Sequence, residues 1–125
     1  MSVAVSHTQA LRLLQELSSS LVNDARLEAA PDFTLRQLAL YLTIYIDQPP
    51  HTVRGLAKSL GVTKPVVTRA LDALGKYGLT TRRRDEKDGR NVIIQRTVKG
   101  ALYVETLGDL VVARAAELKP PEAQE

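Results

Sequence analysis

Basic side chains gather in one stretch of this sequence, where their chemistry is suited to binding a polyanion. Residues 51–99 contain twelve Lys or Arg and four Asp or Glu, a net charge of +8, whereas the rest of the chain carries −5. Guanidinium and ammonium groups bind phosphate oxygens, and guanidinium groups also bind the edge of guanine. This concentration of charge predicts a nucleic-acid partner for the segment.

Residues for catalysis or metal binding are not found at useful spacings. His7 and His51 are far apart, and neither lies at ligand spacing from a pair of carboxylates. The chain has no Cys, which excludes disulfides, thiolate metal sites and cysteine nucleophiles. Ser18–Ser20 has no neighbouring base, and there is no glycine-rich phosphate loop. We therefore expect no enzymatic activity, no catalytic residue, no metal site and no cofactor.

A helix-turn-helix is expected to position the basic side chains. Residues 53–60 have apolar positions at steps of three and four, with Thr52 as the N-cap. Gly61 supplies the left-handed residue that commonly ends a helix. Thr63 is then the expected cap of the next helix, 64–77, whose spacing predicts four buried residues: Val67, Ala70, Leu71 and Leu74.

A charged β-hairpin should follow this second helix. Residues 79–84 and 91–96 are predicted to pair as strands, with Gly89 near the reversal. A hairpin directly after a helix-turn-helix is a wing, here residues 82–92. Because successive strand side chains alternate, at least one of the three arginines at 82–84 should face away from nucleic acid.

Apolar helices are expected on both sides of this head, residues 51–96. They span about 6–30 and 97–119, the second with Thr97 as its N-cap. The first is either a core helix or a dimerisation helix, and composition does not separate the two. Together these helices carry more apolar side chains than one small head should need to bury, which favours a partner chain.

A further helix at 33–47, with Asp32 as its N-cap, is apolar nearly all round and should be central. Tyr41 and Tyr45 lie one turn apart on it and are expected to pack in the core rather than line a pocket. The chain thus suits one domain, 1–125, mainly α with a small β-hairpin. No apolar run approaches the roughly 20 residues that span a bilayer, and no signal-peptide pattern opens the chain, so a cytoplasmic location is expected.

The sequence resembles the MarR family of bacterial winged helix-turn-helix transcriptional regulators. The similarity lies in LAKSLGVTKPVVTR at 56–69, RRDEKDGR at 83–90 and TVKG at 97–100. The second segment is similar to the family's Asp-x-Arg-Asp-x-Arg wing, with Lys87 in place of the first Arg. The resemblance covers residues 51–100, and outside them only the order of the helices agrees.

The resemblance implies a homodimer on pseudo-palindromic double-stranded DNA. Terminal helices of the two chains interlock in the family, and small-molecule effectors often bind between that region and the DNA head. About 28 residues follow the wing, so we expect one C-terminal helix here in place of the family's usual pair. The terminal helices at 6–30 and 97–119 are then dimerisation helices.

The DNA contacts expected from this arrangement involve the helix 64–77 in the major groove and the wing 82–92 at the minor groove and backbone. The expected contact residues are Ser59, Thr63, Lys64, Pro65, Val66, Thr68, Arg69, Arg82, Arg84, Lys87, Arg90 and Asn91. Asp88 should position Arg90, because a free carboxylate there would repel phosphate. For an effector pocket, the candidate residues are His7, Arg36, Tyr41 and Tyr45.

One alternative is a winged-helix protein-interaction module that does not use its head on DNA, because a fold does not fix a function. The charge of +8 on residues 51–99 argues against it. RNA is a weaker alternative, since the head lacks aromatic side chains that stack on bases.

Overall fold

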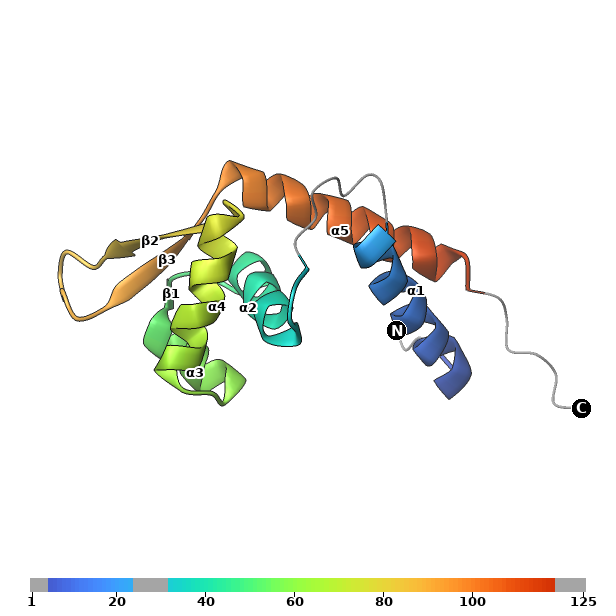
Figure 1. Ribbon diagram of the computed structural model, residues 1–125, viewed down its shortest axis with the longest axis horizontal. Coiled ribbons are helices and arrows are strands. Elements are labelled where there is room, and N and C mark those ends of the chain that lie inside the picture. The colour runs from blue at the N-terminus through green and yellow to red at the C-terminus, as the bar shows by residue number, and fades with distance from the viewer. Residues whose placement is uncertain (1–4, 24–31, 119–125) are drawn as a thin grey trace, which may run out of the picture. The chain divides into compact units, whose positions relative to one another are not determined.

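The structure, a computed structural model, describes residues 5–23 and 32–118. Its elements in chain order are α1 (His7–Asn23), α2 (Leu35–Ile46), β1 (His51–Thr52), α3 (Val53–Leu60), α4 (Lys64–Lys76), β2 (Thr80–Arg84), β3 (Val92–Arg96) and α5 (Val98–Ala116) (Figure 1). The mainly α fold with a winged helix-turn-helix is confirmed. The chain forms two compact units, one of residues 33–104 and one from the residues before and after them, so that α5 contributes to both.

Helix α2 begins later than expected, because its N-cap is Thr34 and not Asp32. Thr34 Oγ1 accepts from the Gln37 N–H over 3.1 Å, and Gln37 Oε1 accepts from the Thr34 N–H over 3.0 Å. This reciprocal capping box satisfies two N–H groups at the start of the helix. A Thr followed three residues later by Gln is the sequence signature that the Asp32 prediction overlooked.

The sheet has three antiparallel strands in the order β1–β3–β2, one more than expected. The additional strand, β1, pairs His51 with Ile94 and Thr52 with Ile93. It directly precedes α3 and is only two residues long. A strand of that length is too short to show an alternating pattern in the sequence. The predicted hairpin is confirmed as β2 and β3, with Arg82 opposite Ile94.

The C-terminus of α2 is anchored to this sheet. Arg96 donates from Nε to Ile44 O over 2.7 Å and from Nη2 to Asp47 O over 2.9 Å. His51 Nε2 lies 3.2 Å from the same Asp47 oxygen. These contacts satisfy carbonyl groups that a helix end leaves free. Arg96, one of the basic residues of the head, therefore has a structural role.

The core of the 33–104 unit lies between α2, the helix-turn-helix and the inner face of the sheet. Its most buried side chains are Leu40, Tyr41, Ile44, Val67, Leu71, Leu74 and Leu79. The burial of Val67, Ala70, Leu71 and Leu74 on α4 was predicted and is confirmed. Tyr41 is a core residue, as expected.

Two tyrosine hydroxyls of α2 hold the start of α5. Tyr41 donates to Gly100 O over 2.5 Å, and Tyr45 donates to Leu79 O over 2.6 Å while accepting from the Thr97 N–H over 3.0 Å. The hydroxyl of Thr97 accepts from the Gly100 N–H over 2.9 Å, which confirms the predicted N-cap. A Cβ at residue 100 would overlap both the Tyr45 hydroxyl and the Leu79 carbonyl, so only glycine fits there.

Burial raises the pKa of the Tyr41 phenol above its ordinary value of 10.0, and the neighbouring Tyr45 and Tyr103 raise it further. The pKa of Tyr103 is also raised by burial. Tyr41 therefore remains a neutral hydrogen-bond donor at any physiological pH.

The other unit contains α1 and the second half of α5. No residue of α1 is buried, and Leu11, Leu14 and Val22 are 67%, 63% and 77% exposed. Within this unit, Arg114 Nε donates to Ser20 Oγ over 3.0 Å. The last helix ends at Ala116, before the expected residue 119, and the expected continuation of the first helix to residue 30 lies outside the described residues. Among those residues, no helix has the length and apolar character needed to cross a membrane.

Candidate nucleic-acid interface

The turn between α3 and α4 has the local geometry predicted from the sequence. Thr52 Oγ1 accepts from the Gly55 N–H over 3.0 Å and caps α3. Gly61 ends the helix with φ +70°, the left-handed conformation that favours glycine. The Val62 N–H then bonds to Ala57 O over 3.0 Å. These contacts close the turn tightly and set α4 across α3, with the helix-turn-helix confirmed.

Helix α4 presents a basic, exposed face on the side opposite its buried residues. The exposed residues on it are Lys64, Pro65, Arg69, Asp72 and Lys76, and the partly exposed ones are Val66 and Thr68. Pro65 lies in the first turn, where its missing N–H costs no helical hydrogen bond. The five residues of α4 expected to meet DNA thus all retain accessible surface.

Thr63 occupies the N-cap position of α4, as predicted, but its side chain makes no capping hydrogen bond. The residue is exposed. Its hydroxyl therefore stays available beside the first N–H groups of a 13-residue helix, where the helix dipole favours an anion. Ser59, near the end of α3, is exposed as well.

The arginines of β2 alternate between the two faces of the sheet, as predicted. Arg82 and Arg84 share the face of Ile94, which is buried, while Arg83 lies on the opposite face. Arg82 Nη2 is 2.5 Å from Asp72 Oδ1 of α4. Arg82 is therefore already paired with Asp72 within the head. Arg83 lies on the outer face of the sheet and was not among the expected contact residues.

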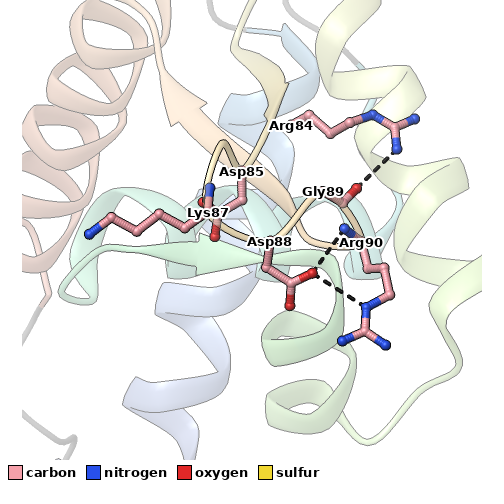
Figure 2. A network of polar contacts seen from close by, with 6 residues as sticks. All are labelled: Arg84, Asp85, Lys87, Asp88, Gly89 and Arg90. Atoms are coloured by element: carbon pink, nitrogen blue, oxygen red, sulfur yellow. Dashed lines mark hydrogen bonds and ion pairs between the residues drawn. The ribbon is translucent and has the colours of Figure 1, made fainter.

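The tip of the wing is held by its own side chains (Figure 2). Arg84 Nη1 donates to Gly89 O over 2.9 Å, across the loop. Asp88 Oδ1 accepts from the Arg90 N–H over 3.1 Å and lies 3.4 Å from Arg90 Nε, yet the Arg90 side chain remains 87% exposed. Asp88 thus contacts Arg90 while leaving the end of its guanidinium accessible.

Two further expected contact residues, Lys87 and Asn91, belong to the same loop. The Lys87 N–H donates to Asp85 Oδ1 over 2.9 Å, and Figure 2 shows its ammonium group directed away from the loop. The Asn91 N–H donates to Asp88 O over 2.9 Å. The backbone of Asn91 closes the hairpin, and its side chain is partly exposed.

The four residues considered for an effector pocket have different surroundings. Tyr41 and Tyr45 are in ring contact, with centroids 4.9 Å apart, but Tyr41 is fully buried. Arg36 is exposed and lines a groove beside Arg69 instead. His7 belongs to the other unit. Within the described ranges, no cluster of three or more His, Asp or Glu could hold a metal ion.

The family model that matches this chain is that of the MarR family, over residues 33–92. This range includes α2, the whole helix-turn-helix and the wing up to the start of β3. No curated protein sequence matches the chain significantly.

Solved structures of similar fold include several bound to DNA. The S. aureus MepR–DNA complex has 27% identity and a TM-score of 0.67, covering 83% of this chain and 83% of that one. A mutant of MarR from E. coli, complexed with operator DNA, has 26% identity and a TM-score of 0.66, covering 89% and 74%. The transcriptional repressor CouR, bound to a 23-mer DNA duplex, has 25% identity and a TM-score of 0.67, covering 88% and 72%.

Proposed function

This chain belongs to the MarR family, and we propose that it is a sequence-specific double-stranded DNA-binding transcriptional regulator that acts as a homodimer. The family and the fold are those of transcriptional regulators and not of enzymes. The observation that carries the proposal is the basic, exposed face of α4 beside an arginine-tipped wing, on a fold whose solved relatives bind DNA.

In this proposal, α4 enters the major groove with its N-terminal half leading, because base pairs are distinguishable there. The residues that read bases are Lys64, Pro65, Val66, Thr68 and Arg69. Arg69 is suited to a bidentate contact with guanine, and Val66 to a thymine methyl group. Ser59 and Thr63 contact phosphates, which is supported by the unengaged Thr63 hydroxyl.

The wing lies along the DNA backbone, with Arg90 reaching into the minor groove. Asp88 positions Arg90, which their 3.4 Å contact supports. Lys87 and Asn91 contribute backbone contacts near the tip. Arg82 is paired with Asp72, and Arg84 donates to the Gly89 carbonyl. We therefore assign both arginines mainly to stabilising the wing, with DNA contact as a lesser role.

The dimer is proposed to form through the terminal helices, so that residues 1–125 work as one functional domain. MarR-family members are dimers, and the apolar side chains exposed on α1 suit a second chain. Two-fold symmetry of the protein then requires a pseudo-palindromic operator. A regulator of bacterial operators acts in the cytoplasm, where the chromosome lies.

Selection of bound sequences from a random pool of DNA duplexes tests the proposal. We expect enrichment of two related half-sites whose centres lie about one helical turn apart. Affinity for the selected site should fall roughly 10³- to 10⁵-fold between 50 and 200 mM salt if the dimer makes about six to ten phosphate contacts. Absence of enrichment, with scrambled duplexes bound equally or not at all, would instead favour the protein-interaction module.

A further inference from the structure

A groove lies between the first turn of α2 and one side of α4, within the 33–104 unit. It is lined by Thr34, Arg36, Gln37, Val66, Arg69 and Ala70, and we name it the α2–α4 groove. Its volume is about 140 Å³. Pockets that enclose a small-molecule ligand usually measure about 300–1,000 Å³. The groove therefore has room for a single small group, such as the phosphate of a larger partner.

The charges of the α2–α4 groove favour an anion. Arg36 and Arg69 both line it and are both exposed. Across the part of the chain that the structure describes, neither forms an ion pair or a side-chain hydrogen bond. Arg36 also stands in the first turn of α2, at the positive end of the helix dipole, where a cation is disfavoured. An anion in the groove would offset the unfavourable effect of the helix dipole on Arg36 and would balance the charge of Arg69.

The polar side chains of α2 at this groove are set by the capping box. Thr34 and Gln37 use their oxygens to accept each other's backbone N–H groups. The Gln37 side-chain amide keeps its NH₂ donors, which adds a neutral hydrogen-bond donor to the two guanidinium groups. These side-chain groups all donate hydrogen bonds, and an ionised phosphodiester has only acceptor oxygens, so the two match.

We propose that the α2–α4 groove binds a phosphate group of the DNA backbone, with Arg36 supplying a contact that begins outside the helix-turn-helix. The inference rests on the proposed function. Arg69 connects the two parts of the interface, because it belongs both to the exposed face of α4 and to the groove. A phosphate bound there lies beside the base pairs that α4 reads and fixes the register of α4 on the duplex.

The salt dependence of DNA binding by the full chain tests this contact. Arg36→Ala should reduce the slope of log affinity against log salt by about 2 for a dimer, one phosphate from each protomer at about 0.9 per phosphate. The loss should be similar on the selected site and on a scrambled duplex, because phosphates carry no base identity. Arg12→Ala removes the same charge from α1 and should leave the slope at the wild-type value.

A neutral backbone identifies the phosphate. Methylphosphonate is placed at single symmetric pairs of positions in the selected duplex, and binding of the wild type and of Arg36→Ala is compared. At one pair of positions, methylphosphonate should lower the affinity of the wild type. The same modification should leave the affinity of Arg36→Ala unchanged, because that variant already lacks the contact. If the wild type binds DNA with a steep slope and Arg36→Ala keeps that slope, the groove contact is wrong and the proposed function stands.

Two other outcomes overturn the inference in different ways. If the wild type shows no salt-dependent binding to any duplex, the proposed function fails and the groove contact fails with it. Inorganic phosphate is the second probe, added at constant ionic strength against chloride in a thermal melt. The overturning result is that phosphate raises the melting temperature of the wild type but not of Arg36→Ala, while the two proteins have the same slope of log DNA affinity against log salt. In that case the groove binds a free anion and not the DNA backbone.

Discussion

Arg82 Nη2 lies 2.5 Å from Asp72 Oδ1, and this ion pair joins the first strand of the wing to the exposed face of α4. Both side chains are partly exposed, at 35% and 51%, so the pair should stabilise the fold by no more than about 1 kcal/mol. Its larger effect is on charge, because Asp72 neutralises one cation and places a carboxylate on the face proposed to meet DNA.

Asp72→Asn should therefore tighten non-specific DNA binding with little effect on stability. The substitution removes a charge that repels phosphate and frees Arg82, so the salt slope should become steeper, by up to about 2 for the dimer. Filter binding to a scrambled duplex measures this. Asp109→Asn is the matched control, since Asp109 is an exposed carboxylate of the other unit. Equal slopes for the two variants would contradict the prediction.

Arg69 and Arg90 should differ in the kind of binding that they support. Arg69→Ala should cost about 1–3 kcal/mol and relax base preference at one position of each half-site. Arg90→Ala should weaken all duplexes alike and flatten the salt slope. Competition with duplexes altered at single positions separates the two. An unchanged affinity and slope for Arg90→Ala would show that the wing does not lie at the backbone.

Thr52 and Thr63 stand at equivalent N-cap positions, but only Thr52 makes a capping bond. Thr52→Ala should therefore lower the free energy of unfolding by about 1 kcal/mol, and Thr63→Ala by less than about 0.5 kcal/mol. Thr63→Ala should instead weaken DNA binding, with partial recovery in Thr63→Ser. Urea unfolding measures the stability of each variant, and DNA titration of the same samples measures its binding. A larger stability loss at Thr63 would mean that its hydroxyl serves the helix.

Gly100 and Gly108 both lie in α5 but should respond oppositely to alanine. A Cβ at Gly100 would overlap Tyr45 Oη and the Leu79 carbonyl, whereas one at Gly108 meets no atom within 4 Å. Gly100→Ala should cost about 1–3 kcal/mol or more. Gly108→Ala should add up to about 1 kcal/mol through helix propensity. Thermal melts measure both, and a neutral Gly100→Ala would exclude the close approach of α2 and α5.

The buried phenol of Tyr41 should make the fold sensitive to alkali. Its pKa is raised in the folded state above the ordinary value of 10.0, so the folded chain retains a proton that the unfolded chain loses. The associated stability is complete below about pH 10 and decreases as the pH rises further, by at most about 1.4 kcal/mol per pH unit. Urea unfolding between pH 9 and 11.5 should show this decline, and Tyr41→Phe should show a shallower one.

Much of the fold could be predicted because its signals are local. The caps at Thr52 and Thr97 and the left-handed Gly61 depend on a few neighbouring residues, and the structure agrees with all three. The predicted cap at Asp32 was wrong, because Thr34 forms the capping box with Gln37 and the helix begins after it.

Features that depend on distant contacts were not predictable. Strand β1 exists because β3 pairs with it, and the two residues alone carry no periodicity. The position of Arg36 beside Arg69 follows from the packing of α2 on α4, which the sequence pattern of either helix does not specify. The pairing of Arg82 with Asp72 likewise depends on how the strand and the helix approach each other.

The bond from Arg84 to Gly89 determines how much order the wing must gain when it meets a partner. A loop that closes on its own arginine samples fewer conformations in the free protein, so less conformational entropy is lost on association. Breaking that bond should therefore leave the docked complex with the same contacts but lower its affinity. The affinity for DNA should then depend partly on a side chain that need not touch the DNA.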